Sequence, residues 1–131
     1  MLAKVLPPQK VYVSSAGKKG LGVFAASPIG AGETIEVAHV REVPQSLERA
    51  IEELAPELFH YLFWWEGGAA DAQSAVAFGF APFYNHSRTP NLKLSHNFED
   101  RTITFQTVRD VQPNEELTFD YDTKLWFDDS E

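Results

Sequence analysis

Two stretches decide the fold of this chain: Tyr84-Asn85-His86-Ser87-Arg88-Thr89-Pro90-Asn91 and Glu115-Glu116-Leu117-Thr118-Phe119-Asp120-Tyr121. Taken alone, Asn85-His86-Ser87 is typical of a polar turn, and Pro90-Asn91 is a common turn pair. Taken alone, Tyr121 would be a core residue with a satisfied hydroxyl, as buried tyrosines of β proteins usually are. Neither stretch assigns a function by itself, so the residues upstream matter.

A third motif lies near the N-terminus and contains two glycines: Lys19-Gly20-Leu21-Gly22-Val23-Phe24-Ala25. Two glycines in this spacing are, alone, an ordinary turn at the entry to a strand. The pattern continues through Ile29-Gly30-Ala31-Gly32-Glu33-Thr34-Ile35, well beyond the glycines.

In this order, the three motifs resemble the signature of the SET domain, the catalytic module of S-adenosylmethionine-dependent protein-lysine methyltransferases. The resemblance spans most of the chain and is strongest to the short, stand-alone SET proteins of bacteria and viruses. It implies a mainly β fold of several small curled sheets with one short helix. It also implies a pseudoknot, in which the C-terminal segment passes beneath a loop formed by the Asn-His-Ser stretch.

The apolar pattern predicts mostly short strands. Apolar and polar residues alternate over residues 10–13, 34–38, 91–94 and 102–106. One helix is expected between Pro44 and Pro56, with Ser46 as its N-cap and an apolar face packed on the sheets. That face comprises Leu47, Ala50, Ile51 and Leu54. No repeat or low-complexity linker interrupts the chain, so we expect a single SET domain over residues 1–131.

The resemblance implies S-adenosyl-L-methionine as the cofactor and a set of residues that hold it. Glycine backbone can approach the methionine part closely and offer N–H donors to its carboxylate, with added charge from Lys19. Asn85 is expected near the amino-acid part, and the His86 backbone at the adenine. The expected cofactor-binding residues are Lys19, Gly20, Leu21, Gly22, Tyr61, Asn85, His86 and Trp126, of which Trp126 would cover the adenine.

Catalysis is expected from Tyr121, whose hydroxyl and π-face would orient the substrate amine. The substrate channel is expected to comprise Tyr61, Phe63, Phe119 and Tyr121. For Phe63 and the two tryptophans after it, a core role and a channel role stay equally open. Relatives carry phenylalanine or tyrosine at the position of Phe119, and phenylalanine suggests that dimethyl- or trimethyl-lysine can form.

The sequence departs from the family pattern at three places. Arg88 stands where many relatives have cysteine, and Asn114 where they often have glycine, although asparagine tolerates a positive φ. Residues 37–59 differ from the better-known histone methyltransferases, and this region often shapes the peptide groove. The cofactor chemistry is therefore better specified than the substrate.

Composition limits the remaining function classes. The chain has 131 residues, of which 44% are hydrophobic, enough for one ordinary core. It contains no cysteine, which excludes disulfides and thiolate zinc sites, and its four histidines are scattered, so we expect no metal. A formal charge of −8 disfavours direct nucleic-acid binding and favours a basic protein or peptide partner.

The cellular setting is expected to be intracellular. No apolar run is long enough to span a membrane, and Pro7-Pro8 stands where a signal peptide needs an apolar core. We therefore expect a soluble protein of the cytoplasm, or of a host cell's nucleus, that is not secreted and does not act at a membrane.

These observations lead to one main hypothesis and one alternative. The main hypothesis is a methyltransferase that acts on the ε-amine of lysine in a histone or another basic protein. The alternative is a catalytically silent SET-like module that binds a basic peptide or partner protein. A homodimer is also possible, because small SET proteins with a short C-terminus can complete the site with a partner chain.

Overall fold

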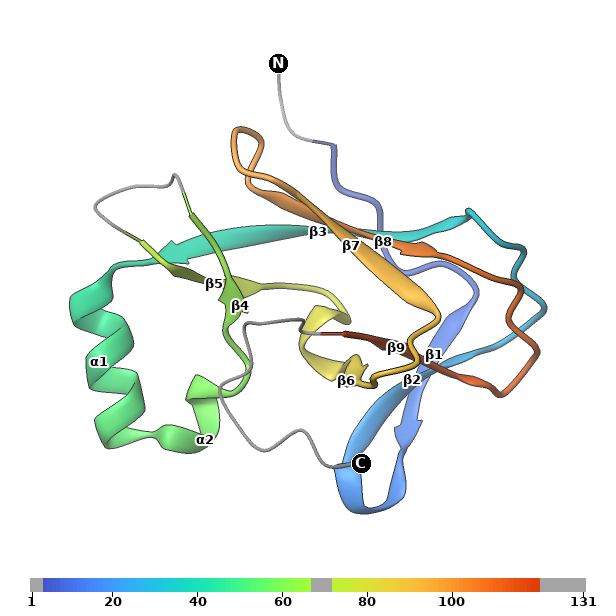
Figure 1. Ribbon diagram of the computed structural model, residues 1–131, viewed down its shortest axis with the longest axis horizontal. Helices are drawn as coiled ribbons and strands as arrows, with labels where there is room; N and C mark the ends of the chain where they lie inside the picture. The colour runs from blue at the N-terminus through green and yellow to red at the C-terminus, as the bar shows by residue number, and fades with distance from the viewer. Residues whose placement is uncertain (1–3, 67–71, 121–131) are drawn as a thin grey trace.

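The computed structural model describes residues 4–66 and 72–120 (Figure 1). Its architecture is mainly β, as predicted, with two sheets and a small helical region. The strands are β1 (Val11–Ser15), β2 (Leu21–Ala25), β3 (Thr34–Val43), β4 (Phe63–Trp64), β5 (Ser74–Ala77), β6 (Asn85–His86), β7 (Leu92–Asn97), β8 (Thr102–Thr107) and β9 (Glu116–Phe119). The helices are α1 (Gln45–Leu54) and α2 (Pro56–Phe59), with 3-10 turns η1 (Gly17–Lys19) and η2 (Ala81–Phe83).

The four-stranded sheet joins segments from both ends of the described chain. Its strand order is β1-β2-β9-β6, so the last strand lies between β2 and β6. β9 runs antiparallel to β2 and parallel to β6, with Asn85 opposite Thr118 and His86 opposite Phe119. Two of the three motifs therefore become strand neighbours, and β2 brings the third motif beside them.

The five-stranded sheet has the order β4-β5-β3-β8-β7, and every neighbouring pair is antiparallel. It curls so strongly that its edges meet through aromatic side chains. The ring of Trp64 on β4 lies 5.4 Å from that of His96 on β7, and the rings of Trp65 and Phe98 are 4.7 Å apart. Trp65 is fully buried there, which places it in the core.

The long strand β3 contains an irregularity that changes which side chains face inward. Its pairing with β8 shifts register between Thr34 and Glu36. As a result Ile35 and Glu36, which are consecutive, are both only 1% exposed. A β-bulge commonly re-aims a side chain in this way.

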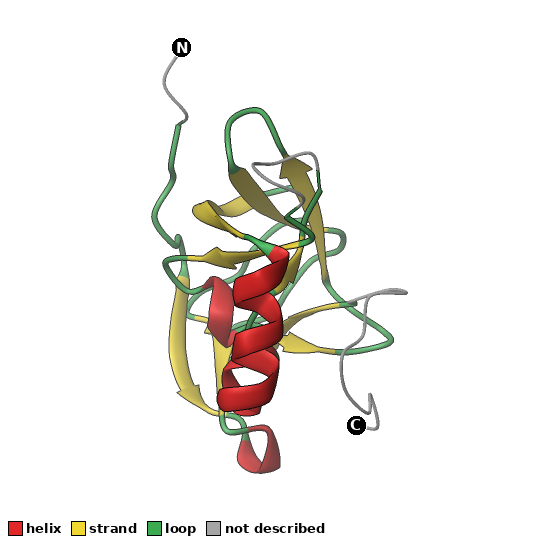
Figure 2. Cartoon of the chain, turned by 90° about the vertical axis from the view of Figure 1, so that its left-hand side faces the viewer, coloured by secondary structure: helices red, strands yellow, loops and turns green. Residues whose placement is uncertain are grey.

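The helical region differs from the prediction in several details. The predicted N-cap Ser46 is wrong, because α1 begins at Gln45 and Pro44 occupies the N-cap without a side-chain hydrogen bond. The prediction that the apolar face of this helix packs on the sheets is also wrong. Leu54 is 83% exposed, and of the four residues of that face Ile51 packs against the small cluster of Val43, Phe59 and Leu62. Figure 1 shows α1 and α2 together at one end of the molecule, and Figure 2 looks onto α1 from that end, so α1 covers little of either sheet. The structure also adds the short helix α2, where Pro56 occupies the first turn.

The turn before β9 matches the expectation for its asparagine. Asn114 adopts φ of 67°, the left-handed conformation that asparagine tolerates. Its side-chain oxygen accepts a hydrogen bond of 2.8 Å from the Tyr12 hydroxyl on β1. No helix in residues 4–66 and 72–120 has the length and apolar character needed to cross a membrane.

Candidate active site

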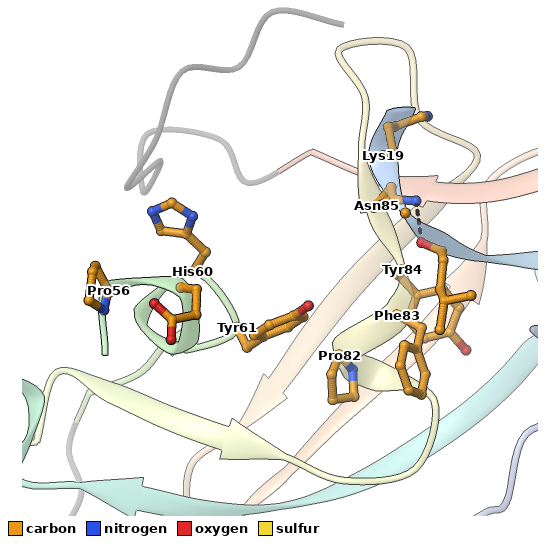
Figure 3. A pocket seen from close by; sticks show the side chains of 11 residues that line it. Lys19, Pro56, His60, Tyr61, Pro82, Phe83, Tyr84 and Asn85 are labelled. Atoms are coloured by element: carbon orange, nitrogen blue, oxygen red, sulfur yellow. Dashed lines mark hydrogen bonds between the residues drawn. The ribbon is translucent and has the colours of Figure 1, made fainter. Parts of the chain in front are cut away.

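A cleft of about 590 Å³ lies between the helical region and the four-stranded sheet (Figure 3). Three segments line it: the η1–β2 connection, α2 with the turn after it, and η2 with the start of β6. Its lining residues are Lys19, Gly20, Leu21, Pro56, Glu57, His60, Tyr61, Pro82, Phe83, Tyr84 and Asn85. Five of the eight predicted cofactor-binding residues are among them, namely Lys19, Gly20, Leu21, Tyr61 and Asn85.

One side of the cleft is held by a network of polar side chains from three strands or strand ends. The Asn85 amide donates to the Leu21 carbonyl at 2.9 Å and to Glu116 Oε2 at 2.7 Å. Glu116 Oε1 accepts from Lys19 Nζ at 2.9 Å in an ion pair. These contacts fix the Asn85 side chain between β2 and β9. We refer to Lys19, Asn85 and Glu116 as the polar network.

Gly22 lies directly against this network. A Cβ on Gly22 would lie 2.6 Å from Glu116 Oε2 and 3.0 Å from Asn85 Nδ2. A side chain at this position would have to displace the Glu116 carboxylate, so glycine leaves the polar network undisturbed. Gly20 differs: its φ of 87° favours glycine, and the space above its Cα is open.

Asn91 also contacts β9, and the sequence analysis assigned it only to a turn pair and to the start of a strand. It is 1% exposed, its amide donates to the Glu116 carbonyl at 2.8 Å, and its side-chain oxygen accepts from the Thr118 backbone at 2.8 Å. Because both bonds go to β9, Asn91 holds that strand beside the loop that carries the Asn-His-Ser stretch. The only sequence signal for this role is that Asn91 follows Asn85 by six residues in a stretch rich in turn residues.

A second buried group that the sequence did not reveal lies next to Asn85. The Tyr84 hydroxyl donates to Glu36 Oε1 at 2.8 Å, and Tyr84 is 2% exposed. Burial raises the pKa of Glu36, although hydrogen bonds from Tyr84 and Phe80 oppose the rise. Burial, with the nearby Glu36 charge, also raises the pKa of Tyr84 well above its ordinary value.

The opposite side of the cleft comes from α2 and the turn that follows it. Figure 3 shows His60 and Tyr61 facing Lys19 and Asn85 across the opening. Tyr61 is 52% exposed, so an aromatic face is available to a bound molecule. Glu57 adds a carboxylate to this side.

Several predicted residues do not line this cleft. Phe63 and Phe119 lie in the core, stacked with ring centroids 5.8 Å apart and less than 8% exposed. His86 is also buried, and its Nδ1 lies 3.7 Å from Asp120 Oδ1. The predicted Tyr121 and Trp126 lie outside the described residues. Within the described ranges, no group of three His, Asp or Glu side chains could hold a metal ion.

The cleft suits a zwitterionic nucleoside such as S-adenosylmethionine. Its volume is within the range typical of small-molecule sites. The Lys19 ammonium can meet a carboxylate, and the Glu57 carboxylate can meet a cation. The rings of Tyr61 and Phe83 offer apolar faces to a base. The described residues therefore fit the cofactor.

Comparison with known proteins identifies the class. A family model described as SET domain matches residues 20–122. The chain is 32% identical over 117 residues to a histone-lysine N-methyltransferase of Schizosaccharomyces pombe that is specific for H3 lysine-37, a match that covers 86% of this chain and 73% of that protein. It is 36% identical over 113 residues to the histone-lysine N-methyltransferase Set2 of Drosophila melanogaster, a match that covers 79% of this chain but 5% of Set2.

A solved structure agrees at the level of the fold. The crystal structure of a candidate histone methyltransferase from Plasmodium falciparum superposes with a TM-score of 0.65 and 24% identity, and covers 91% of this chain and 98% of that one. The chain therefore belongs to the SET domain family, and the predicted mainly β fold of curled sheets is confirmed, while the C-terminal segment of the predicted pseudoknot lies outside the described residues.

Proposed function

We propose that this protein is an S-adenosylmethionine-dependent protein-lysine methyltransferase whose active site is the cleft between α2 and the polar network. Membership of the SET domain family and histone-lysine methyltransferases among its relatives support lysine methyltransferase activity. The observation that carries the proposal is that Lys19 to Leu21 and Asn85, which are far apart in sequence, line one cleft beside β9. β9 leads directly to Tyr121.

The chain's own residues would hold the cofactor in a fixed orientation. Lys19 would bind its carboxylate, with the open space above Gly20 allowing close approach, Asn85 would bind its amino-acid part, and the Tyr61 ring would contact its apolar surface, with Trp126 over the adenine. When bound, S-adenosylmethionine would supply a methyl group on a positively charged sulfur, and an uncharged amine can attack this methyl carbon while the sulfur leaves as a neutral thioether. The Leu21, Gly22 and His86 backbones complete the proposed set.

The substrate lysine must reach the reaction centre uncharged and aligned. A narrow aromatic channel disfavours the ammonium form and lowers the lysine pKa from its usual value near 10.4. We propose Tyr121 as the catalytic residue, whose hydroxyl would orient the amine. Alignment of the amine then provides much of the rate enhancement.

We propose a histone or another basic protein as the substrate class. The relatives are named as enzymes that act on histone lysines, and the net charge of −8 favours a Lys- and Arg-rich partner over nucleic acid. Such a substrate implies an intracellular site of action, in the cytoplasm or a nucleus.

Phenylalanine at position 119 favours di- or trimethylated products, and mass spectrometry that finds only monomethyl-lysine would contradict this.

The silent binding module and the homodimer are separate proposals with separate tests. A binding-only module would bind a basic peptide without transferring methyl groups. A homodimer predicts twice the monomer mass of 14.7 kDa in light scattering.

The first test combines calorimetric titration with S-adenosylmethionine and radiolabelled methyl transfer to histone H3 and other basic proteins. We expect micromolar binding and transfer to lysine. Tyr121→Phe should keep the cofactor affinity and lose roughly a hundredfold or more in turnover. Absence of cofactor binding would remove the proposal, and binding without transfer would favour the silent module.

A further inference from the structure

Strand β3 carries a buried carboxylate that none of the three motifs explains. Glu36 is 1% exposed, and Oε1 accepts from the Tyr84 hydroxyl at 2.8 Å while Oε2 accepts from the Phe80 backbone N–H at 3.0 Å. A buried carboxylate is costly unless hydrogen bonds compensate it. Its position therefore requires a reason beyond core packing.

The surrounding backbone is shaped to admit this carboxylate. The register shift at the start of β3 turns Glu36 inward next to Ile35. On the other side, Gly79 adopts φ of 74°, and a Cβ there would overlap the Glu36 carboxylate. A bulge on one strand and a glycine on the facing turn thus both provide space for the same side chain.

The two hydrogen bonds of Glu36 reach both ends of one wall of the cleft. Phe80 immediately precedes η2, and Tyr84 immediately follows it. Between these two anchors, Pro82 and Phe83 line the cleft, and Tyr84 continues directly into Asn85. Phe80 and Tyr84 both donate hydrogen bonds to the Glu36 carboxylate. This one side chain therefore fixes the start and the end of the turn.

We propose that Glu36 is a positioning residue that holds η2, and through Tyr84 also Asn85, in the geometry that binds the cofactor. The inference rests on the proposed function but concerns a residue outside the cleft. Displacement at Tyr84 would move the neighbouring Asn85 amide away from Leu21 and Glu116. Loss of the clamp should therefore weaken cofactor binding more than it slows turnover at saturating cofactor.

The test uses variants that separate the clamp from general stability. Glu36→Leu keeps approximately the side-chain volume but removes both hydrogen bonds. Glu36→Gln can keep both, because its oxygen accepts from Phe80 while its amide donates to a reoriented Tyr84 hydroxyl. Tyr84→Phe removes one bond only.

Glu42 offers a matched control on the same strand. Its side chain is 9% exposed and accepts from Trp65 Nε1 at 3.2 Å, with Arg101 Nε at 3.3 Å, at sites that do not line the cleft. Glu42→Leu should lower the unfolding free energy without changing cofactor affinity.

The measurements are the dissociation constant for S-adenosylmethionine, the turnover number and the unfolding free energy of each variant. We expect the dissociation constant to rise about tenfold in Glu36→Leu and about threefold in Tyr84→Phe, and to stay near the wild-type value in Glu36→Gln and Glu42→Leu. The turnover number at saturating cofactor should change less than about threefold in all four.

Three results would overturn the inference: wild-type affinity in Glu36→Leu, Glu36→Gln as weak as Glu36→Leu, or an equal loss of affinity in Glu42→Leu. If Glu36→Leu does not fold, Tyr84→Phe decides, and an unchanged dissociation constant there overturns it. Failure of the wild-type protein to bind the cofactor would remove the proposed function and this inference together. Normal wild-type binding with unaffected variants would remove the inference alone.

Discussion

The two sides of the cleft are stabilised differently. On the sheet side, Asn85 contacts Leu21 and Glu116 through hydrogen bonds of 2.9 and 2.7 Å, and Lys19 adds an ion pair. On the helical side, α2 buries only Phe59, in the small cluster with Val43 and Leu62, while α1 behind it has no buried residue and Tyr61 is half exposed. The sheet side is thus built as part of the fold, whereas the helical side is attached at its periphery. This suggests that cofactor binding depends on a rigid wall, and that substrate selection can vary on the helical side with little cost to the fold.

The largest effect is expected from Asn85→Ala, which removes the centre of the polar network. It leaves the Leu21 carbonyl and one Glu116 oxygen without their donor, so cofactor affinity should fall about a hundredfold and the unfolding free energy by about 1–3 kcal/mol. Calorimetry and urea unfolding measure the two quantities. Loss of affinity with unchanged stability would show that the network is not part of the fold, which contradicts the comparison.

Gly22→Ala tests how tightly the network is packed. The new methyl group must displace the Glu116 carboxylate, so we expect cofactor affinity to fall about tenfold. Gly30→Ala is a suitable control, because its Cβ would lie 3.3 Å from Glu33, a residue that does not line the cleft. Equal affinities in the two variants would mean that Glu116 relaxes freely.

On the helical side, Tyr61→Ala should affect substrate binding more than the stability of the fold. Because its ring is half exposed, we expect the unfolding free energy to change by less than about 0.5 kcal/mol. The KM for a protein substrate should rise about fivefold, since a channel wall is lost. A stability loss as large as that of Asn85→Ala would show that both sides are equally integrated.

The acid response should depend on the sheet side, where Glu115 precedes β9. Its pKa is lowered from the ordinary 4.5, first by the Gln112 backbone N–H and further by Arg109. A lowered pKa in the folded state stabilises the fold above pH 4.5, and this contribution is lost as the pH falls through the lowered value. Urea unfolding between about pH 3 and pH 7 should show a shallower loss for Glu115→Gln than for the wild type. Identical pH profiles would exclude this role.

The smallest effect is expected from Leu54→Ser at the end of α1. Leu54 is 83% exposed, so stability and cofactor affinity should both stay within about 0.5 kcal/mol of the wild type. Urea unfolding and calorimetry check both values. A clear loss of stability would show that this helix end is covered by part of the protein, against its peripheral placement.

Local patterns in the sequence predicted local structure well. The alternating segments became β1, β3, β7 and β8, and Asn114 adopted the positive φ expected of it. The pattern failed at Glu36, because a bulge reverses the alternation and no local signal marks it. It also failed at Leu54, because apolar periodicity shows that a helix has an apolar face but not that a sheet lies opposite.

The polar network was beyond sequence reasoning for a different reason. Lys19 and Glu116 are 97 residues apart, and their contact exists only because β9 lies between β2 and β6. The motifs predicted that Lys19 and Asn85 share a site, through resemblance to a family. They did not show Glu116 as the residue that joins them, since a glutamate in a surface-like motif carries no signal of its partner.

The placement of β9 in the middle of its sheet also has a consequence for how the protein is made. During synthesis, β2 and β6 leave the ribosome before their common neighbour exists, and pairing over such sequence distances is intrinsically slow. The nascent chain must therefore keep two strand edges unpaired until residues 116–119 emerge. Cofactor present during translation would find no complete site before that moment, and would act only on the last step of folding.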